Sequence, residues 1–406
     1  MIEVNVNSML RFILCGIGVA AIFLVLQDAF EVMLLPRRVQ RRTRFAVIYF
    51  RSVWRVCSRF ASLLSPSRGR ETLLSQFGAL SMLGLFASWA ASLIFGFGVL
   101  EWALQPRAGV SSHVASLGDQ LYMSGVTFFT LGYGDAVPHS HAAKVASVLE
   151  AGVGLGFIAV VISYLPLIHQ FFSRREVLVI RLDGRAGSPP TAAALLCKHA
   201  GALDNIDAFL REWEVWGSEL LEGHLSYPML AYYRSQHDNQ SWLAALAAVT
   251  DCCALILVGA NGAKAFQARM TFGMMRQVAV ELARSFHIRP SRYEGVDRLP
   301  PEDYRNLTAI LANSGFTLRD EEDARISLQA LRATYEPLLD GLARYLMLTL
   351  PDWIPRDNTQ DHWTRGPRGL LAQRLIVQLE ANVQHSLSDE VVEPASLWRR
   401  IRARLR

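Results

Sequence analysis

The chain has 406 residues, 51% of them hydrophobic, and its mean hydropathy is positive. This is more apolar sequence than a soluble domain of this size needs for its core, which argues against an exclusively soluble protein. The formal net charge of +5 divides into +7 up to Arg175 and −2 after it. Because the apolar half carries the basic surplus, basic residues flanking membrane spans explain the charge, and nucleic-acid binding is not expected.

Three long apolar runs lie before residue 175. They cover about 8–35, 74–104 and 142–172, and each is long enough to cross the hydrocarbon core of a bilayer, which is roughly 30 Å thick. The first run is too long for a secretory signal peptide and has no basic start, so we expect it to be retained. The second run repeats small residues, which permit close helix packing in lipid. The sequence therefore predicts three transmembrane helices.

A segment rich in arginine separates the first two runs. Its arginines are Arg37, Arg38, Arg41, Arg42, Arg44, Arg51, Arg55, Arg59, Arg68 and Arg70. The positive-inside rule predicts a cytoplasmic location for this loop, hence an external N-terminus and a cytoplasmic C-terminus. Within it, residues 45–63 resemble a helix that lies in the inner interface with its arginines toward the lipid headgroups. A voltage sensor is the alternative interpretation, but too few spans precede the third run to build one.

Between the second and third runs stands the segment TFFTLGYGD, which ends at Asp135. It resembles the pore signature of potassium channels, T-x-x-T-[VIL]-G-[YF]-G-D, and is similar to two-span bacterial pores and to the pores of two-pore-domain channels. The resemblance implies a selectivity filter formed by Thr130, Leu131, Gly132, Tyr133 and Gly134. In such filters, rings of backbone carbonyls replace the hydration shell of K⁺. Glycine suits these positions because it adopts backbone angles that strain other residues.

The resemblance also implies how ions are bound and how the filter is supported. K⁺ would lie at the carbonyls of Thr130, Leu131, Gly132 and Tyr133, and four identical chains would surround it. We expect a pore helix over about 116–129, with its negative C-terminal end directed at the ion. Tyr122 is the expected hydrogen-bond partner of Asp135, and Thr127 is part of the same support. Met123 and Val126 depart from the family pattern, which affects expectations for inactivation but not for selectivity.

The third run contains the candidates for hinge and gate. Gly154 falls where related inner helices carry a hinge glycine, and both a hinge and a packing role are open for it. Pro166 is expected to kink the helix. Ile162, Leu165 and Phe172 are the candidates for the narrowest inner point. Glu150 is an intramembrane carboxyl group, for which we expect a hydrogen bond to the pore helix of its own or a neighbouring subunit.

The remaining residues have a helical pattern and no recognised family. Helices are expected over about 190–200, 203–222, 239–257, 263–287, 301–314, 322–349, 366–386 and 395–404. Residues 176–181 look like a strand and leave open a nucleotide-binding domain, although no G-x-G-x-x-G turn follows. A polar cluster at 224–242 is either a ligand pocket or a helix junction, with Asp238 or Asn239 capping the next helix. The five cysteines form no metal-binding pattern, and no catalytic motif is present.

Together these observations predict a membrane all-α protein with a pore-loop channel fold. The expected parts are an N-terminal transmembrane helix (1–36), a basic segment (37–73), a pore domain (74–174) and a mainly helical cytoplasmic domain (175–406). The expected function is passive K⁺ conduction across the cell membrane by a homotetramer, without enzyme activity or a cofactor. Anionic lipid would contact the arginine-rich loop and the basic tail at 398–406. The alternatives are a less selective cation channel and a ligand-sensing channel whose C-terminal domain binds a nucleotide or another small molecule.

Overall fold

The computed structural model describes residues 2–33, 45–65, 68–105, 116–199, 206–236, 239–259, 265–289, 297–316 and 321–356, together with residues 374 and 378. Every regular element in these ranges is a helix, as the sequence predicted. The predicted helices over 366–386 and 395–404, the basic tail and the arginines at 37–44 lie outside the described residues, apart from the two single positions.

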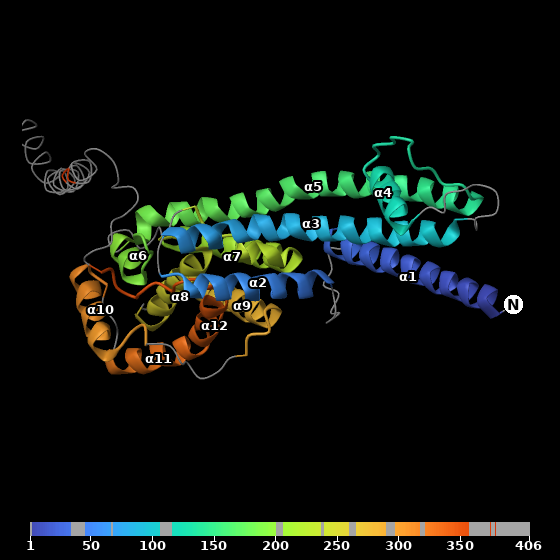
Figure 1. The fold of residues 1–406 in the computed structure, drawn as a ribbon. Helices are drawn as coiled ribbons and strands as arrows, with labels where there is room; N and C mark the ends of the chain where they lie inside the picture. Colours follow the sequence, from blue (N-terminus) through green and yellow to red (C-terminus); the bar gives the residue numbers. More distant parts are fainter. Residues whose placement is uncertain are drawn as a thin grey trace, which may run out of the picture.

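Three long helices dominate the molecule, α1 (Ile2–Met33), α3 (Arg68–Leu104) and α5 (His141–Ala186). They share one long direction, and the short helix α4 (Leu117–Phe128) lies near one end of it (Figure 1). At 1.5 Å per residue, α3 is about 55 Å long and α5 about 69 Å. Both exceed the roughly 30 Å hydrocarbon core, so neither helix can lie entirely within it.

Close glycine contacts join α1 to α3. A Cβ added at Gly18 would lie 2.8 Å from the Gly96 carbonyl oxygen, and one at Gly96 would lie 2.9 Å from Ile22. Two helices can approach this closely only where their residues are small. Close packing drives helix association in a bilayer, because lipid gives adjacent helices little hydrophobic drive to associate. Arg11, near the start of α1, donates to the Gln105 carbonyl oxygen over 2.7 Å, so this end of α1 lies beside the end of α3.

Asp28 lies near the C-terminal end of α1, where a carboxylate could extend to the membrane interface. The side chain is instead buried, where it accepts hydrogen bonds from Trp89 Nε1 (3.0 Å) and from the Ala46 backbone N–H (3.1 Å). Ala46 belongs to the first turn of α2 (Phe45–Leu63), where a carboxylate is favourable for the helix dipole. Asp28 thus joins α1, α2 and α3.

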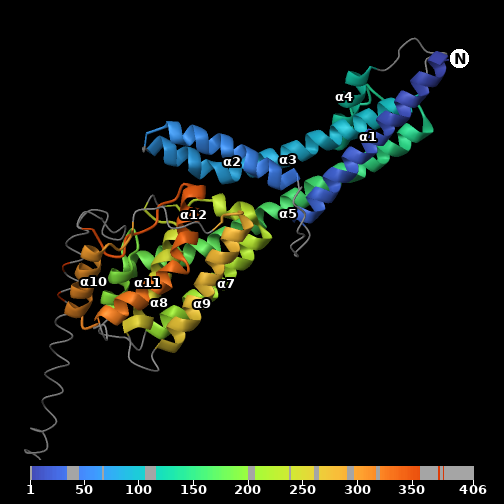
Figure 2. The same cartoon turned by 90° about the horizontal axis from the view of Figure 1, so that it is seen from below.

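Helix α2 has the bounds that the sequence predicted, but protein covers one of its faces. It lies alongside the first part of α3 (Figure 2), and Ala46, Phe50, Trp54 and Ala61 are buried. Trp54 donates from Nε1 to the Tyr345 carbonyl oxygen over 2.9 Å. This face is therefore not available to lipid, whereas Arg55 and Arg59 on the other side are exposed.

The C-terminal helical domain, residues 192–356, is built around one large core. It comprises α6 (Ala192–His199), α7 (Ile206–Ser226), η2 (Pro228–Tyr232), α8 (Trp242–Gly259), α9 (Phe266–Ser285), α10 (Pro301–Asn313), α11 (Glu321–Ala333) and α12 (Glu336–Leu346). Helix α8 is the fourth segment that is long and apolar enough to span a membrane, yet 89% of its 18 residues are buried inside the protein. It is therefore the central helix of this core, which agrees with the three spans that the sequence predicted.

Three details of the chain after residue 174 differ from the sequence predictions. Residues 176–181 are not a strand but part of α5, and the buried positions 175, 176, 179, 182, 183 and 186 follow a helical period. The helix expected over 322–349 is divided at Thr334 and Tyr335, because Pro337 fits only the first turn of a new helix. The cap of α8 is Ser241, whose Oγ accepts the Ala244 N–H over 3.0 Å.

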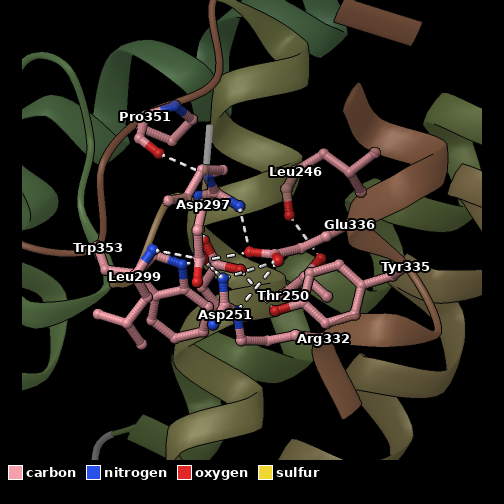
Figure 3. A network of polar contacts seen from close by, with 11 residues as sticks. Leu246, Thr250, Asp251, Asp297, Leu299, Arg332, Tyr335, Glu336, Pro351 and Trp353 are labelled. Atoms are coloured by element: carbon pink, nitrogen blue, oxygen red, sulfur yellow. Dashed lines mark hydrogen bonds and ion pairs between the residues drawn. The ribbon is translucent and has the colours of Figure 1, made fainter. Parts of the chain in front are cut away.

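A buried polar network joins two loops of this domain, which contain Arg298 and Pro351, to its helices (Figure 3). The Arg298 guanidinium donates to Asp251 on α8 (2.5 Å), to Glu336 on α12 (3.1 Å) and to the Pro351 carbonyl oxygen (2.9 Å). Tyr335 completes the shell of Asp251 with a hydrogen bond of 2.6 Å. Buried charges need partners of this kind, so the network specifies one arrangement of α8, α12 and the two loops.

Candidate functional site

The pore helix is present as α4, within one residue of its predicted bounds at each end. Ser116 caps it: Ser116 Oγ accepts the Asp119 N–H (3.1 Å), while the Asp119 carboxylate accepts the Ser116 N–H (2.9 Å). This reciprocal arrangement satisfies two backbone donors at the helix start. The C-terminal end of α4, at Phe128, leads directly into the predicted filter.

The backbone of the predicted filter has an unusual repeating conformation. Thr130 (φ 56°), Gly132 (φ 60°) and Gly134 (φ 77°) are left-handed, whereas Leu131 and Tyr133 between them are not. In an extended strand successive carbonyls point to opposite sides, but alternation of left- and right-handed residues turns them to one side. A row of carbonyls on one side of the chain is what an ion-coordinating filter requires.

Thr130 is a residue whose conformation sequence reasoning missed. Only the two glycines were expected to be left-handed, yet this β-branched residue has a positive φ as well. Its backbone N–H donates to the Thr127 carbonyl oxygen over 3.0 Å, and the Leu131 N–H donates to the Val126 carbonyl oxygen over 2.8 Å. These two bonds close the end of the pore helix and hold Thr130 in a conformation that costs about 1–3 kcal/mol.

The expected bond between the pore helix and the outer end of the filter is present. Tyr122 Oη donates to Asp135 Oδ2 over 2.9 Å, and Asp135 Oδ1 accepts the Ala136 N–H over 3.0 Å. Leu131 and Tyr133, in contrast, are not packed against their own pore helix: their side chains are 53% and 67% exposed. A single chain offers no surface that covers these two side chains.

Helices α3 and α5 hold the pore helix from two sides. A Cβ at Gly98 of α3 would lie 2.7 Å from the Leu121 side chain, and a Cβ at Gly154 of α5 would lie 2.1 Å from the Phe128 carbonyl oxygen. Of the two roles left open for Gly154, the structure therefore provides direct evidence for close packing. Gly152 and Gly156, on the same helix, have no such neighbour.

The other inner-helix candidates divide into two groups. Helix α5 continues through Pro166, and Ile162 (65% exposed) and Leu165 (37% exposed) are uncovered in the single chain. Phe172 differs from expectation, because its ring packs against Tyr233 of the same chain with the centroids 5.9 Å apart. Phe172 is thus part of the junction with the C-terminal domain and is not a free pore-lining group.

This junction also contains the polar cluster that the sequence singled out at 224–242. The buried Arg175 donates to the carbonyl oxygens of Leu230 (2.9 Å) and Tyr233 (2.8 Å), and it lies 3.5 Å from His224 Nε2. Burial and the Arg175 cation lower the pKa of His224 to about 3, so this imidazole is neutral at physiological pH. A cavity of about 270 Å³ lies beside it, between α5 and α7.

Comparison with known proteins supports the assignment of the pore region. A family model described as "Ion channel" matches residues 84–166, which include most of α3, all of α4 and the first part of α5. Residues 84–166 are thus similar to an ion-channel domain. This confirms the predicted pore-loop channel fold, in which a pore helix and filter stand between an outer and an inner helix.

Several curated proteins are similar to the chain that contains this channel domain. The "Uncharacterized membrane protein YdjJ" of Bacillus subtilis is 24% identical over 215 residues, which cover 51% of this chain and 59% of YdjJ. "Protein LctB" of Geobacillus stearothermophilus and that of Bacillus caldotenax are 27% and 28% identical over 95 residues, which cover 21% of this chain and 70% of each relative. No solved structure matches at a comparable level of significance. Together with the helices that are long and apolar enough to span a bilayer, these similarities indicate a membrane protein whose residues 84–166 resemble an ion channel.

The region that matches the family model includes only part of α3 and part of α5. Helix α3 starts before the matched region, and α5 continues well past it to Ala186. Both extensions pack on the C-terminal helical domain, through Phe77 of α3 and Val179 of α5 among others. The inner helix of the channel is therefore continuous with an element of the C-terminal core.

Proposed function

We propose that this chain is one subunit of a potassium-selective channel that conducts K⁺ passively through a tetrameric pore. The observation that carries the proposal is the filter segment, where the TLGYGD sequence has alternating backbone handedness at Thr130, Gly132 and Gly134. This conformation supports ion coordination by carbonyls, and the full signature supports K⁺ as the ion. A cation channel of lower selectivity is the competing proposal.

The proposed chemistry is the replacement of water by backbone oxygen. A K⁺ ion would leave its hydration shell for the carbonyls of Thr130, Leu131, Gly132 and Tyr133, supplied in register by four chains. The side chains of Leu131 and Tyr133, exposed in one chain, would then be covered by neighbouring subunits. The negative end of α4 would favour a cation at the inner mouth.

Ion flux in liposomes tests this proposal directly. Purified protein would be reconstituted into vesicles loaded with K⁺, and efflux would be followed in a K⁺ or Na⁺ gradient. We expect K⁺ efflux without an energy source and little Na⁺ flux. Equal K⁺ and Na⁺ flux would favour the less selective channel, and no flux of either ion would contradict the proposal.

The first structural prediction is a homotetramer. Each chain supplies one filter strand, and a ring of carbonyls around an ion requires several strands in closed symmetry. Native mass measurement in mild detergent should give four chains per particle. A stable dimer with no larger species would contradict this prediction.

The second prediction concerns orientation in the cell membrane. We propose that the N-terminus and the outer end of the filter face outside, while the arginine-rich segment and the C-terminal domain are cytoplasmic. The contact between Arg11 and the end of α3 supports a location of the N-terminal end of α1 on the filter side. The exposed Arg55 and Arg59 and the tail at 398–406 would contact anionic lipid.

Single cysteines near Asn5 and Arg42, each in a cysteine-free background, test this orientation. An impermeant thiol reagent on intact cells should label the cysteine near Asn5 and not the one near Arg42. Permeabilised cells, in which both sites should react, are the control. The reverse labelling pattern in intact cells would show that the proposed topology is inverted.

A further inference from the structure

Buried polar contacts connect α4 to α3 and α5 in the channel region. Ser124 on the pore helix is fully buried, and its hydroxyl group lies 2.8 Å from the Ile94 carbonyl oxygen on α3. The same hydroxyl group is hydrogen-bonded to Oε1 of Glu150 on α5, which is also fully buried. One serine thus joins the outer helix, the pore helix and the inner helix, and the sequence-based expectation of a bond from Glu150 to its own pore helix is met.

Counting hydrogens shows which form of Glu150 fits this site. A serine hydroxyl group has one hydrogen, and a carbonyl oxygen has none to give. If Ser124 donates to Ile94, the second contact is a hydrogen bond only when Glu150 donates to Ser124 Oγ. Glu150 must then carry a proton.

The surroundings of Glu150 agree with a neutral group. Within the described residues no basic side chain forms an ion pair with Glu150, and its Oε2 has no hydrogen-bond partner. The other titratable group nearby is Glu101 on α3, also fully buried and hydrogen-bonded to Ser147. Two carboxyl groups without a cation in an apolar span are far too costly to keep in ionised form.

The bridge also has a defined position relative to the filter. Glu150 and Gly154 are one turn apart on α5, and their partners Ser124 and Phe128 are one turn apart on α4. The two helices are thus in contact at two successive turns, and the second contact is at the residue that ends the pore helix. A shift at Ser124 would move Phe128 and, with it, the start of the filter at Thr130.

We propose that Glu150 is a positioning residue for the filter, a neutral carboxyl group that holds the pore helix between the outer and inner helices through Ser124. The proposal rests on the proposed function, because its main effect is on ion selection. Glu150 itself does not touch the ion. It sets the distance between α4 and α5, on which the register of the four carbonyl rows depends.

Three single variants and one double variant of the full-length protein test this role. Glu150→Gln keeps the size of the side chain and supplies an N–H donor to Ser124, so we expect the K⁺-to-Na⁺ flux ratio to remain within about twofold of the wild type. Glu150→Leu and Ser124→Ala remove the bridge, and we expect each to lower the ratio about tenfold, the effect of one buried hydrogen bond. The double variant Ser124→Ala/Glu150→Leu should be no worse than either single variant, because both belong to one interaction.

Separate measurements distinguish a positioning role of Glu150 from a folding defect and from a failure of the proposed function. Particle mass and thermal unfolding identify variants that fail to assemble, and the flux ratio is compared only among assembled proteins. An unchanged K⁺-to-Na⁺ flux ratio in assembled Glu150→Leu would overturn the proposal. A flux ratio that falls in Glu150→Gln would also overturn it, because this result would show that an ionised carboxylate is needed. Infrared difference spectra of wild type minus Glu150→Gln should contain the carbonyl stretch of a protonated carboxyl group. That signal does not depend on flux, so its absence contradicts the neutral bridge even if the wild type proves unselective.

Discussion

Gly132→Ala should abolish K⁺ flux in reconstituted vesicles. The cost does not come from crowding within one chain, because an added Cβ at Gly132 has no neighbour within 4 Å. It comes from the backbone, since φ at this position is +60°. A non-glycine residue held in such a region costs about 1–3 kcal/mol, and in a tetramer the cost recurs four times at one ion pathway. Relaxation of the strain would turn the carbonyl away from the row and remove an ion site.

The chain offers a matched control for this substitution. Gly273 lies exposed on α9, and a Cβ there would also have no neighbour within 4 Å. Gly273→Ala should leave K⁺ flux unchanged and stabilise the helix by about 0.5–1 kcal/mol, since alanine is the better helix former. If Gly132→Ala vesicles passed K⁺ at the wild-type rate and selectivity, the assignment of the filter would be wrong.

The left-handed glycines of the predicted filter could be anticipated from sequence because this segment is a local structure. The residues that shape it are consecutive, and two of them are glycines whose positive φ only a small set of turns and filters requires. The capped pore helix is local in the same sense, from Ser116 to Phe128. The left-handed Thr130 is not predictable in this way, because β-branched residues strongly avoid that conformation unless surrounding bonds impose it.

The length of the inner helix could not be predicted, for a different reason. The run from Val177 to Ile180 is rich in β-branched residues and indicates a strand when considered alone. Its burial pattern is helical only because α7 and α8 of the C-terminal domain pack on one face of α5. Tertiary packing overrode the local preference.

Long-range polar contacts were the least visible feature in the sequence. Asp28 contacts Ala46 and Trp89, 18 and 61 positions away in the sequence, and Arg298 contacts Asp251, 47 positions away. A single sequence identifies such charges as needing partners but does not say which ones they find. The sequence led us to expect a hydrogen bond from Glu150 to a pore helix. Only the structure shows that this bond is made to Ser124, whose hydroxyl group also contacts the Ile94 carbonyl oxygen.

The close contact at Gly154 leads to a second prediction with a large effect. A Cβ at this position would lie 2.1 Å from the Phe128 carbonyl oxygen, and 2.9 Å and 3.0 Å from the carbonyl carbon and Cα of the same residue. All three are backbone atoms at the end of the pore helix, so no side-chain rotation can relieve the clash. Gly154→Ala should therefore push α4 and α5 apart, lower the free energy of unfolding by about 1–3 kcal/mol, and reduce K⁺ flux at least about tenfold.

The same experiment separates packing from hinge bending at Gly154. If this glycine served only as a hinge, alanine would stiffen and stabilise the helix by about 0.5–1 kcal/mol, and the melting temperature would rise. If it served for packing, the melting temperature would fall. For a chain of this size, each kcal/mol lost from the free energy of unfolding lowers it by at most roughly 2–4 °C. Gly152→Ala and Gly156→Ala are the controls, since neither position has a neighbour within 4 Å in the chain. Higher stability in all three variants would exclude the packing role, whereas a loss confined to Gly154→Ala would show that the inner helix needs glycine where it meets the filter support.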